Sequence, residues 1–396
     1  MEKLINITGK ALSGEWGIDD EEGIGISVLR TTNFTNDGII DYSNVITRTI
    51  TKKNIADKFL RKGDIIIEKS GGSDNQPVGR VVYFDNDENK YLFNNFTGLL
   101  RVKDTSKWLP KYIFYSLFAN YQSGGTRRYE NKTTGLHNLQ TDFYVKDFEI
   151  KEISYGEQIE ICELFDGITD LIDKRKRQLE KLDELVKSRF IEMFGTLNAN
   201  EKGFDVIDIE KLCTLIKDGT HQTPTYTEDK QNGFKFLSSK DVMTQKICWE
   251  DIKYIPAELH EKLYATIQPK RNDILMSKNG VNYGVAAVND TDEVFDIYVS
   301  LALLRPKTDR VNPVYLRCAI NNPDTKRQFD SSIKGIGVPN LHLGEIKKTK
   351  VLLPPISKQN EFTDFVEQVD KSKFEIKQSL EKLEVLKKAL MQKYFG

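Results

Sequence analysis

Two long stretches of the chain share one pattern of hydrophobic and charged positions. In residues 155–195 and again in residues 356–396, apolar side chains recur every three or four residues, with charged residues between them. The apolar positions are Ile161, Leu164, Ile168, Leu171, Leu182, Leu185 and Met193 in the first stretch, and Phe362, Phe365, Val369, Ile376, Leu380, Leu383, Leu386 and Leu390 in the second. The spacing predicts two long helices with an apolar seam. A helix of about 35 residues is about 50 Å long, which favours a packed antiparallel pair.

The two stretches also agree residue by residue. LEKLDELVKSRFIEMFG ends at Gly195, and LEKLEVLKKALMQKYFG ends at Gly396. The shift that lays Gly195 on Gly396 also lays Gln158 on Gln359. Further upstream the likeness continues through three segment pairs: GLHNL (135–139) with GVPNL (337–341), GDIIIEKSGG (63–72) with NDILMSKNGV (272–281), and VLRTTNF (28–34) with FLSSKDV (236–242). The chain is therefore an internal two-fold repeat.

The stretches before each helix are rich in short β-type runs such as DIIIE and DILMS, bounded by Gly, Asn and Asp. We therefore expect an α+β fold with two pseudo-symmetric mixed domains and two long antiparallel coiled-coil helices. The expected boundaries are a first domain at 1–154, a first helix at 155–195, a second domain at 196–355 and a second helix at 356–396. Pro354 and Pro355 form a stiff entry to the second helix.

Composition and charge limit the classes of protein to which the chain could belong. No run approaches 18 uncharged apolar residues, so we expect no membrane span, and the start MEKLINITGK is too polar for a secretory signal. The four cysteines form no CxxC pair and the four histidines form no cluster, which favours reduced cytoplasmic thiols and no metal site. The net charge is −1. Nucleic-acid binders are often more basic, so a DNA-binding interpretation depends on local patches.

The sequence matches known catalytic motifs only incompletely. Around Pro354-Pro355, Leu353 and Ile356 stand where an adenine methyltransferase needs a polar residue and an aromatic one. In DIIIEKS, Glu68 and Lys69 are adjacent and would face opposite sides of a strand, unlike a nuclease site. The chain has no Walker loop. None of these catalytic motifs is therefore complete in this sequence.

Two polar loops are more informative. DGTHQTP (218–224) combines small hydroxyls, a histidine and a proline-stiffened turn, which suit phosphates and base edges. GGTRRYENK (124–132) gathers basic and amide residues. Taken alone, each loop is also consistent with a structural or solvated turn.

The order and duplication of these features resemble the specificity subunit (HsdS-like) of a Type I restriction–modification enzyme. The likeness is carried by GEWG (14–17), the GDI-type and GxxNL-type segments, DGTHQTP and the repeated helix ending in Phe-Gly. It implies two target recognition domains, each reading one half of an asymmetric bipartite DNA site. The helices would act as an antiparallel spacer. The first half departs from the pattern because it shows no loop of the DGTH type.

The resemblance also implies partners and cofactors. Two copies of a methyltransferase subunit would bring S-adenosylmethionine for adenine methylation, and restriction subunits would bring ATP and Mg. This chain would bind double-stranded DNA but no cofactor, metal or membrane.

We expect loop residues of each half to contact one half-site. In the first half these are Arg30, Thr31, Asn33, Lys69, Arg80, Arg127 and Arg128. In the second half they are Thr220, His221, Thr223, Ser239, Lys240, Lys278, Asn279 and Tyr283. The alternative is a non-catalytic coiled-coil adaptor or scaffold without DNA specificity. A fused restriction–modification polypeptide is disfavoured by the missing catalytic motifs.

Overall fold

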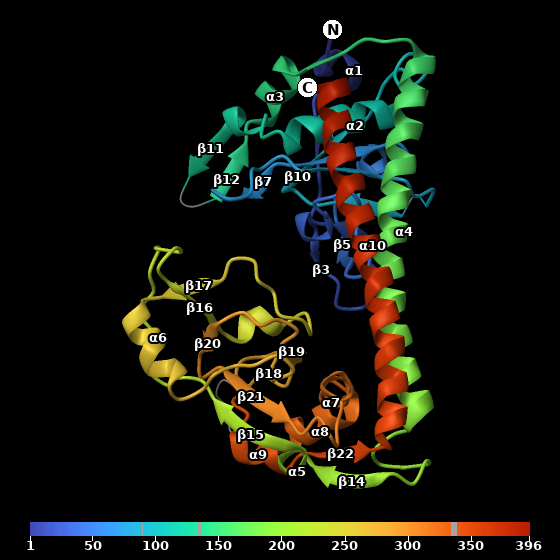
Figure 1. Ribbon diagram of the computed structural model, residues 1–396. Helices are drawn as coiled ribbons and strands as arrows, with labels where there is room; N and C mark the ends of the chain where they lie inside the picture. The colour runs from blue at the N-terminus through green and yellow to red at the C-terminus, as the bar shows by residue number, and fades with distance from the viewer. Residues whose placement is uncertain (89, 134–135, 334–338) are drawn as a thin grey trace. The chain divides into compact units, whose positions relative to one another are not determined.

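The computed structural model describes residues 1–396 apart from 89, 134–135 and 334–338, and the chain forms two compact units (Figure 1). Unit 1 contains residues 1–176 and 378–396, and unit 2 contains residues 177–377. Both long helices are thus divided near their middles. This division differs from the four segments expected from the sequence, because each globular part is packed on half of each helix.

The long helices are α4 (Tyr155–Phe194) and α10 (Ile356–Phe395). Ser154 and Glu157 form a capping box at the start of α4, with the Ser154 N–H donating to Glu157 Oε2 at 2.9 Å and the Glu157 N–H donating to Ser154 Oγ at 3.3 Å. After α4, Gly195 adopts a φ of 74°, a left-handed conformation that favours glycine at a helix end.

Within each unit, the start of one long helix lies beside the end of the other (Figure 1). In unit 1, Phe165 of α4 packs on Phe395 of α10 with ring centroids 5.8 Å apart. In unit 2, Phe190 and Phe194 of α4 pack on Phe362 of α10 at 5.4 and 5.5 Å. These contacts confirm the predicted antiparallel pairing and the α+β fold.

Unit 1 is built on short sheets. A four-stranded antiparallel sheet has the order β2 (Leu12–Ser13), β10 (Thr97–Leu100), β6 (Ile65–Glu68), β8 (Val81–Tyr83). A second has the order β3 (Ile18–Asp19), β5 (Ile46–Thr49), β4 (Ile26–Leu29), β9 (Tyr91–Phe93), in which β4 and β9 run parallel. The remaining strands are β11 (Glu130–Thr133), β12 (Leu136–Leu139) and β7 (Ser70–Gly72) in one sheet, and β1 (Glu2–Lys3) and β13 (Glu149–Ile150) in another. The helices are α1 (Leu4–Thr8), α2 (Pro110–Gln122) and α3 (Thr141–Asp147), with 3₁₀ turns η1 (Thr31–Asn33), η2 (Ala56–Lys58) and η3 (Arg127–Tyr129).

Unit 2 has the same plan. Its antiparallel sheet has the order β15 (Cys213–Asp218), β21 (Leu301–Pro306), β18 (Ile274–Ser277), β19 (Ala286–Val288). Its second sheet has the order β17 (Lys253–Ile255), β16 (Phe234–Leu237), β20 (Phe295–Ile297), in which β16 and β20 run parallel. β14 (Asp205–Asp208) pairs with β22 (Lys350–Leu353). The helices are α5 (Ile209–Leu212), α6 (Ala257–Tyr264), α7 (Pro313–Ile320), α8 (Pro323–Ser332) and α9 (Leu343–Lys348), with the 3₁₀ turn η4 (Ser239–Val242).

The repeat read from the sequence corresponds to this shared topology. GDIIIEKSGG forms β6 and NDILMSKNGV forms β18, and each strand lies between two others in its sheet. Both strands are buried on both faces, which explains their continuous apolar runs. VLRTTNF and FLSSKDV each form a strand followed by a 3₁₀ turn closed by a capping box. Gly135 and Gly337, paired by the sequence, lie outside the described residues.

One buried glutamine fastens each long helix to its unit. Gln158 is 1% exposed and its Oε1 accepts from the Leu109 N–H at 2.8 Å, while Gln359 is 0% exposed and accepts from the Asn312 N–H at the same distance. Each amide nitrogen also donates to two backbone carbonyls. The positions that the sequence shift superposes therefore make the same contacts.

Candidate functional site

In unit 2, three chain segments converge at the carboxyl ends of the parallel strands β16 and β20. The Tyr298 N–H donates to the Leu237 carbonyl at 2.9 Å, which continues the strand pair by one residue. Thr220 forms a parallel bridge with Tyr298, and its N–H donates to the Ile297 carbonyl at 3.1 Å. The loop DGTHQTP is thereby held against this end of the sheet.

Gly219 permits this close approach. A Cβ atom at Gly219 would lie 2.1 Å from the Ile297 carbonyl oxygen, so only glycine fits. Two residues later, His221 has a side chain that is 75% exposed, and its Nε2 lies 3.4 Å from Asp218 Oδ2. Thr223 is exposed and Thr220 is half-buried. The loop backbone is thus fixed while the His221 and Thr223 side chains face solvent.

The 3₁₀ turn η4 contributes two further predicted residues to the same end of the sheet. The Ser239 N–H donates to Ser300 Oγ at 3.0 Å, which ties the turn to the segment after β20. Lys240 is more exposed, and its Nζ donates to the Asp251 carbonyl at 3.1 Å. The structure therefore brings together Thr220, His221, Ser239 and Lys240, as expected of one recognition surface.

Lys278 and Tyr283 are placed differently, in the interior of unit 2. Lys278 is 5% exposed and its Nζ donates to Asp218 Oδ2 at 2.7 Å. Burial by itself would raise the pKa of Asp218, but the hydrogen bond and charge of Lys278 outweigh it and the pKa is lowered. Tyr283 is 9% exposed and its hydroxyl donates to Asp330. Lys278 thus supports the loop through Asp218, whereas Tyr283 is held by α8 through Asp330. Asn279 is half-buried and pairs with Asn340.

Unit 1 holds a loop in the same place, so the expectation that the first half has no such loop is wrong. The Glu15 N–H donates to the Phe93 carbonyl at 2.8 Å, as the Thr220 N–H does to Ile297. A Cβ atom at Gly14 would lie 2.1 Å from the Asn94 carbonyl oxygen, and one at Gly219 would lie at the same distance from the Ile297 carbonyl oxygen. Ser13–Trp16 is therefore the counterpart of Asp218–His221. The two loops share only the glycine, which is why the sequence did not reveal the match.

The support beneath the two loops is also equivalent. Lys69 Nζ donates to Ser13 Oγ at 3.1 Å, where Lys278 contacts Asp218 in unit 2. Burial lowers the pKa of Lys69, and the neighbouring Lys58 lowers it further.

The loop of unit 1 differs in its charges. The buried carboxylate of Glu15 bridges Lys52, at 2.8 Å, and Lys58, and hydrogen bonds from these two lysines lower the pKa of Glu15. The Arg48 guanidinium lies 4.4 Å from the centre of the Trp16 ring. The predicted site residues thus did not include Glu15 and Trp16 of this loop or Arg48 of the adjacent strand β5.

Two of the predicted DNA-contacting residues of unit 1 instead make hydrogen bonds within the fold. Arg80 bonds Glu68 through Nε at 3.0 Å and through a second nitrogen at 2.8 Å, and it also donates to the Phe34 and Thr31 carbonyls. Asn33 is 2% exposed and its Oδ1 accepts from the Arg30 N–H at 2.9 Å. Since each uses its polar atoms internally, both hold η1 in place. Arg30 and Thr31 are half-buried at the start of that turn.

Arg127 and Arg128 lie in η3, apart from the contacts just described. Arg127 is exposed and donates to the Asp74 carbonyl at 3.1 Å. Arg128 has a side chain that is 65% exposed, and its guanidinium lies 4.8 Å from the centre of the Tyr129 ring. Both cations are accessible to an anionic partner.

The acidic residues considered for a nuclease site are paired with arginines instead. Asp64 accepts from Arg101 at 2.6 and 2.7 Å, and the equivalent Asp273 accepts from Arg305 at 2.7 and 2.8 Å. Among the described residues, no group of three or more His, Cys, Asp or Glu is arranged to hold a metal ion.

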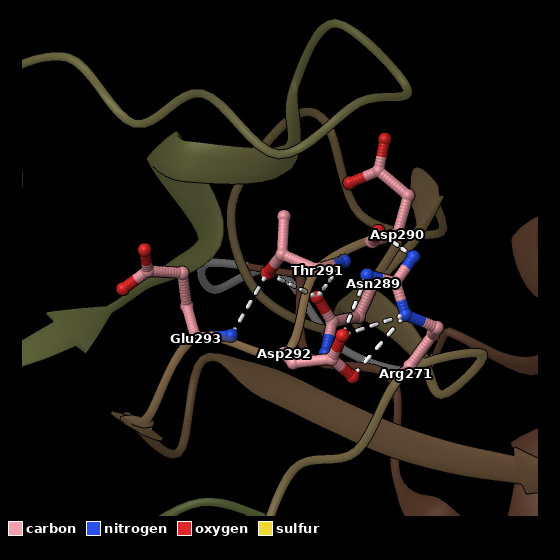
Figure 2. Close-up of polar contacts among 6 residues, drawn as sticks. All are labelled: Arg271, Asn289, Asp290, Thr291, Asp292 and Glu293. Atoms are coloured by element: carbon pink, nitrogen blue, oxygen red, sulfur yellow. Dashed lines mark hydrogen bonds and ion pairs between the residues drawn. The ribbon is translucent and has the colours of Figure 1, made fainter.

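A pocket of unit 2, about 720 Å³, lies beside the turn that joins β19 to β20. Figure 2 shows polar residues of this turn: the Arg271 guanidinium bonds Asp292 at 2.7 Å, and the side-chain Oδ1 of the buried Asn289 accepts from the Thr291 hydroxyl. Unit 1 has a similar pair at the equivalent turn, with Lys62 3.5 Å from Asp87. The repeated pairing indicates that these charges brace a turn.

Comparison with known proteins decides the family. Residues 201–388 match the family model described as the Type I restriction modification DNA specificity domain. The chain is an HsdS-like specificity subunit of a Type I restriction–modification system. The matched family model describes a DNA specificity domain. Separately, none of the described helices is long and apolar enough to cross a lipid bilayer.

Relatives of this specificity subunit align over most of its length. The MjaVIII specificity subunit of Methanocaldococcus jannaschii is 22% identical over 71% of this chain and 68% of its own length. The EcoKI specificity subunit of Escherichia coli K12 is 21% identical over 93% of this chain and 82% of its own length. The crystal structure of the S subunit from M. genitalium superposes with a TM-score of 0.58 and 16% identity, covering 100% of this chain and 95% of the other. This structural likeness shows the shared fold.

Proposed function

We propose that this specificity subunit reads an asymmetric bipartite DNA site, one half-site through each unit. The observation that carries the proposal is the pair of equivalent loops at Gly14 and Gly219. They have the same backbone contacts but different side chains, Glu15 and Trp16 in one and Thr220 and His221 in the other. Identical scaffolds with different side chains suit two half-sites of different sequence, because bases are distinguished by side-chain contacts.

The accessible residues of each surface then contact DNA. In unit 1 these are Arg30, Thr31, Lys69, Arg127 and Arg128, with Trp16 added. In unit 2 they are Thr220, His221, Thr223, Ser239, Lys240 and Asn279. Asn33 and Arg80 hold η1 in place in unit 1, and Lys278 supports the Asp218–His221 loop in unit 2. Tyr283 is instead bound to Asp330 of α8.

Catalysis belongs to partner subunits in this proposal. Two methyltransferase subunits with S-adenosylmethionine methylate adenine, and restriction subunits use ATP and Mg. The two long helices, repeated at LEKL, offer two equivalent docking surfaces. A near-neutral chain of net charge −1 is consistent with partners that supply part of the phosphate contact.

Long-read methylation sequencing tests the proposal. Host DNA is compared with and without this chain, in the presence of its methyltransferase. A split, asymmetric, adenine-methylated motif that disappears without the chain supports the proposal. An unchanged methylome with both proteins present and soluble would favour a coiled-coil adaptor, which should bind its partner in a pull-down but show no DNA selectivity.

A further inference from the structure

The segments that follow β9 and β20 occupy equivalent places at the candidate surfaces. The Asn94 N–H donates to the Leu29 carbonyl, and the Tyr298 N–H donates to the Leu237 carbonyl, each at 2.9 Å. Two residues later, the carbonyl of Phe96 accepts from the Lys69 N–H, and that of Ser300 accepts from the Lys278 N–H, each at 2.8 Å. Residues 94–96 and 298–300 are therefore counterparts.

Each of these segments carries one aromatic ring that the hydrophobic cores of the described residues do not include. Phe96 is 53% exposed, and it is linked to the Gly14 loop through Lys69, whose N–H donates to the Phe96 carbonyl and whose Nζ donates to Ser13 Oγ. Tyr298 is half-buried, with its ring 6.1 Å from that of Phe236 and its backbone paired with Thr220. A single exposed aromatic residue is ordinary on a protein surface. Phe96 matches Ser300 and Tyr298 matches Asn94, so the two rings stand at different positions of the counterpart segments. Each unit nevertheless places one ring outside its hydrophobic cores in this segment, beside its candidate loop.

We propose that Phe96 and Tyr298 contact base edges, one in each half-site, and so contribute to sequence specificity. The inference rests on the proposed function and deepens it. The ring of each residue offers an apolar contact for a base edge such as the thymine methyl group. Phe96 and Tyr298 thus add aromatic contacts to surfaces formed mainly by cations and hydroxyls, to which unit 1 also contributes Trp16.

The test is methylation sequencing with Phe96→Ala and Tyr298→Ala, each expressed with the methyltransferase. We expect each variant to lose preference at a base of one half-site by about tenfold, with the other half-site unchanged. Tyr298→Phe keeps the ring and should retain the preference. Phe143→Ala removes another ring of unit 1, 65% exposed on α3, and should leave the motif unchanged.

Two results would overturn the inference: both alanine variants directing the unaltered motif, or Phe143→Ala altering it as Phe96→Ala does. Phe96→Gln replaces the alanine variant if that protein does not fold, because it keeps bulk at an exposed position. If the unaltered chain directs no motif at all, the proposed function has failed. If it directs a motif that every variant preserves, only the role of Phe96 and Tyr298 has failed.

Discussion

Gln158 and Gln359 show how single residues hold each globular part on the long helices. Each buried side chain makes three hydrogen bonds with backbone groups, one accepted by Oε1 and two donated by the amide nitrogen. A buried donor left without an acceptor costs about 1–3 kcal/mol. The match of Gln158 with Gln359 in the sequence is therefore a match of structural role.

Replacing either glutamine with leucine should destabilise its own unit by about 1–3 kcal/mol, because the N–H of Leu109 or of Asn312 loses its acceptor. Hydrogen exchange, followed in each unit separately, measures the effect. Gln378→Leu, at an exposed position of α10, serves as the control. Equal protection in Gln158→Leu and the unaltered protein would contradict this role.

Glu15 gives unit 1 a dependence on pH. Hydrogen bonds from Lys52 and Lys58 lower its pKa below the ordinary value of 4.5. A carboxylate whose folded pKa is lowered stabilises the fold above its unfolded pKa, and this contribution is lost as the pH falls through the folded pKa. Acidification below pH 4.5 should therefore loosen the Gly14 loop.

Trp16, next to Glu15, reports this change through its fluorescence. We expect Glu15→Gln to loosen the loop already at neutral pH and to remove its acid-induced step. Glu22→Gln, at an exposed position further along the same segment, should keep that step. An acid transition of Trp16 that is identical in Glu15→Gln and the unaltered protein would rule out this role.

At the scale of elements, one glycine decides the position of each candidate loop. Gly14 and Gly219 each lie so close to backbone carbonyl groups at the neighbouring strand end that a Cβ atom would not fit. The counterpart loops SGEW (13–16) and DGTH (218–221) look unrelated in sequence because everything around the glycine differs. Equivalence was therefore visible only from the hydrogen bonds that Glu15 and Thr220 make.

Alanine at Gly14 or Gly219 should displace the loop, since the added Cβ would lie 2.1 Å from a carbonyl oxygen. We expect methylation directed through that unit's half-site to fall at least about tenfold, as for a lost base contact. The measurement is methylation of DNA substrates that vary one half-site at a time. Gly156→Ala, in the first turn of α4 with nothing within 4 Å, should have no such effect.

At the scale of the whole molecule, each unit consists of one globular part together with about half of each long helix. Unit 1 needs residues 378–396 as well as 1–176, since Tyr112 packs on Phe395 at 5.5 Å. A chimera must therefore keep the apolar residues that face α10, or its core will be mismatched.

Exchanging residues 1–154 for those of another specificity subunit, with Tyr112 and Tyr115 retained, should replace one half-site and leave the other unchanged. The reciprocal exchange of residues 196–355 should replace the other half-site. Methylation sequencing identifies both motifs. A chimera that is soluble and active but changes both half-sites, or neither, would contradict recognition of one half-site by each unit.

The long helices, the repeat and the α+β fold could be predicted because they depend on local patterns. Apolar residues at helical spacing specify a seam whatever surrounds them, and the apolar runs of β6 and β18 specify buried strands. The polar loops were predicted less well. Arg80 and Lys278 have the residue types of a DNA contact, but Glu68 and Asp218 bind them inside the fold.

By itself, then, the sequence determined the two long helices, their antiparallel pairing and the doubled plan of the molecule. The tertiary structure alone decided that Gly14 is the counterpart of Gly219, that Arg80 and Lys278 face inward, and that residues 94–96 and 298–300 are counterpart segments. The reason is physical. A helix is specified by contacts a few residues apart, whereas exposure and pairing depend on segments such as 13–16 and 93–96 that meet only after folding.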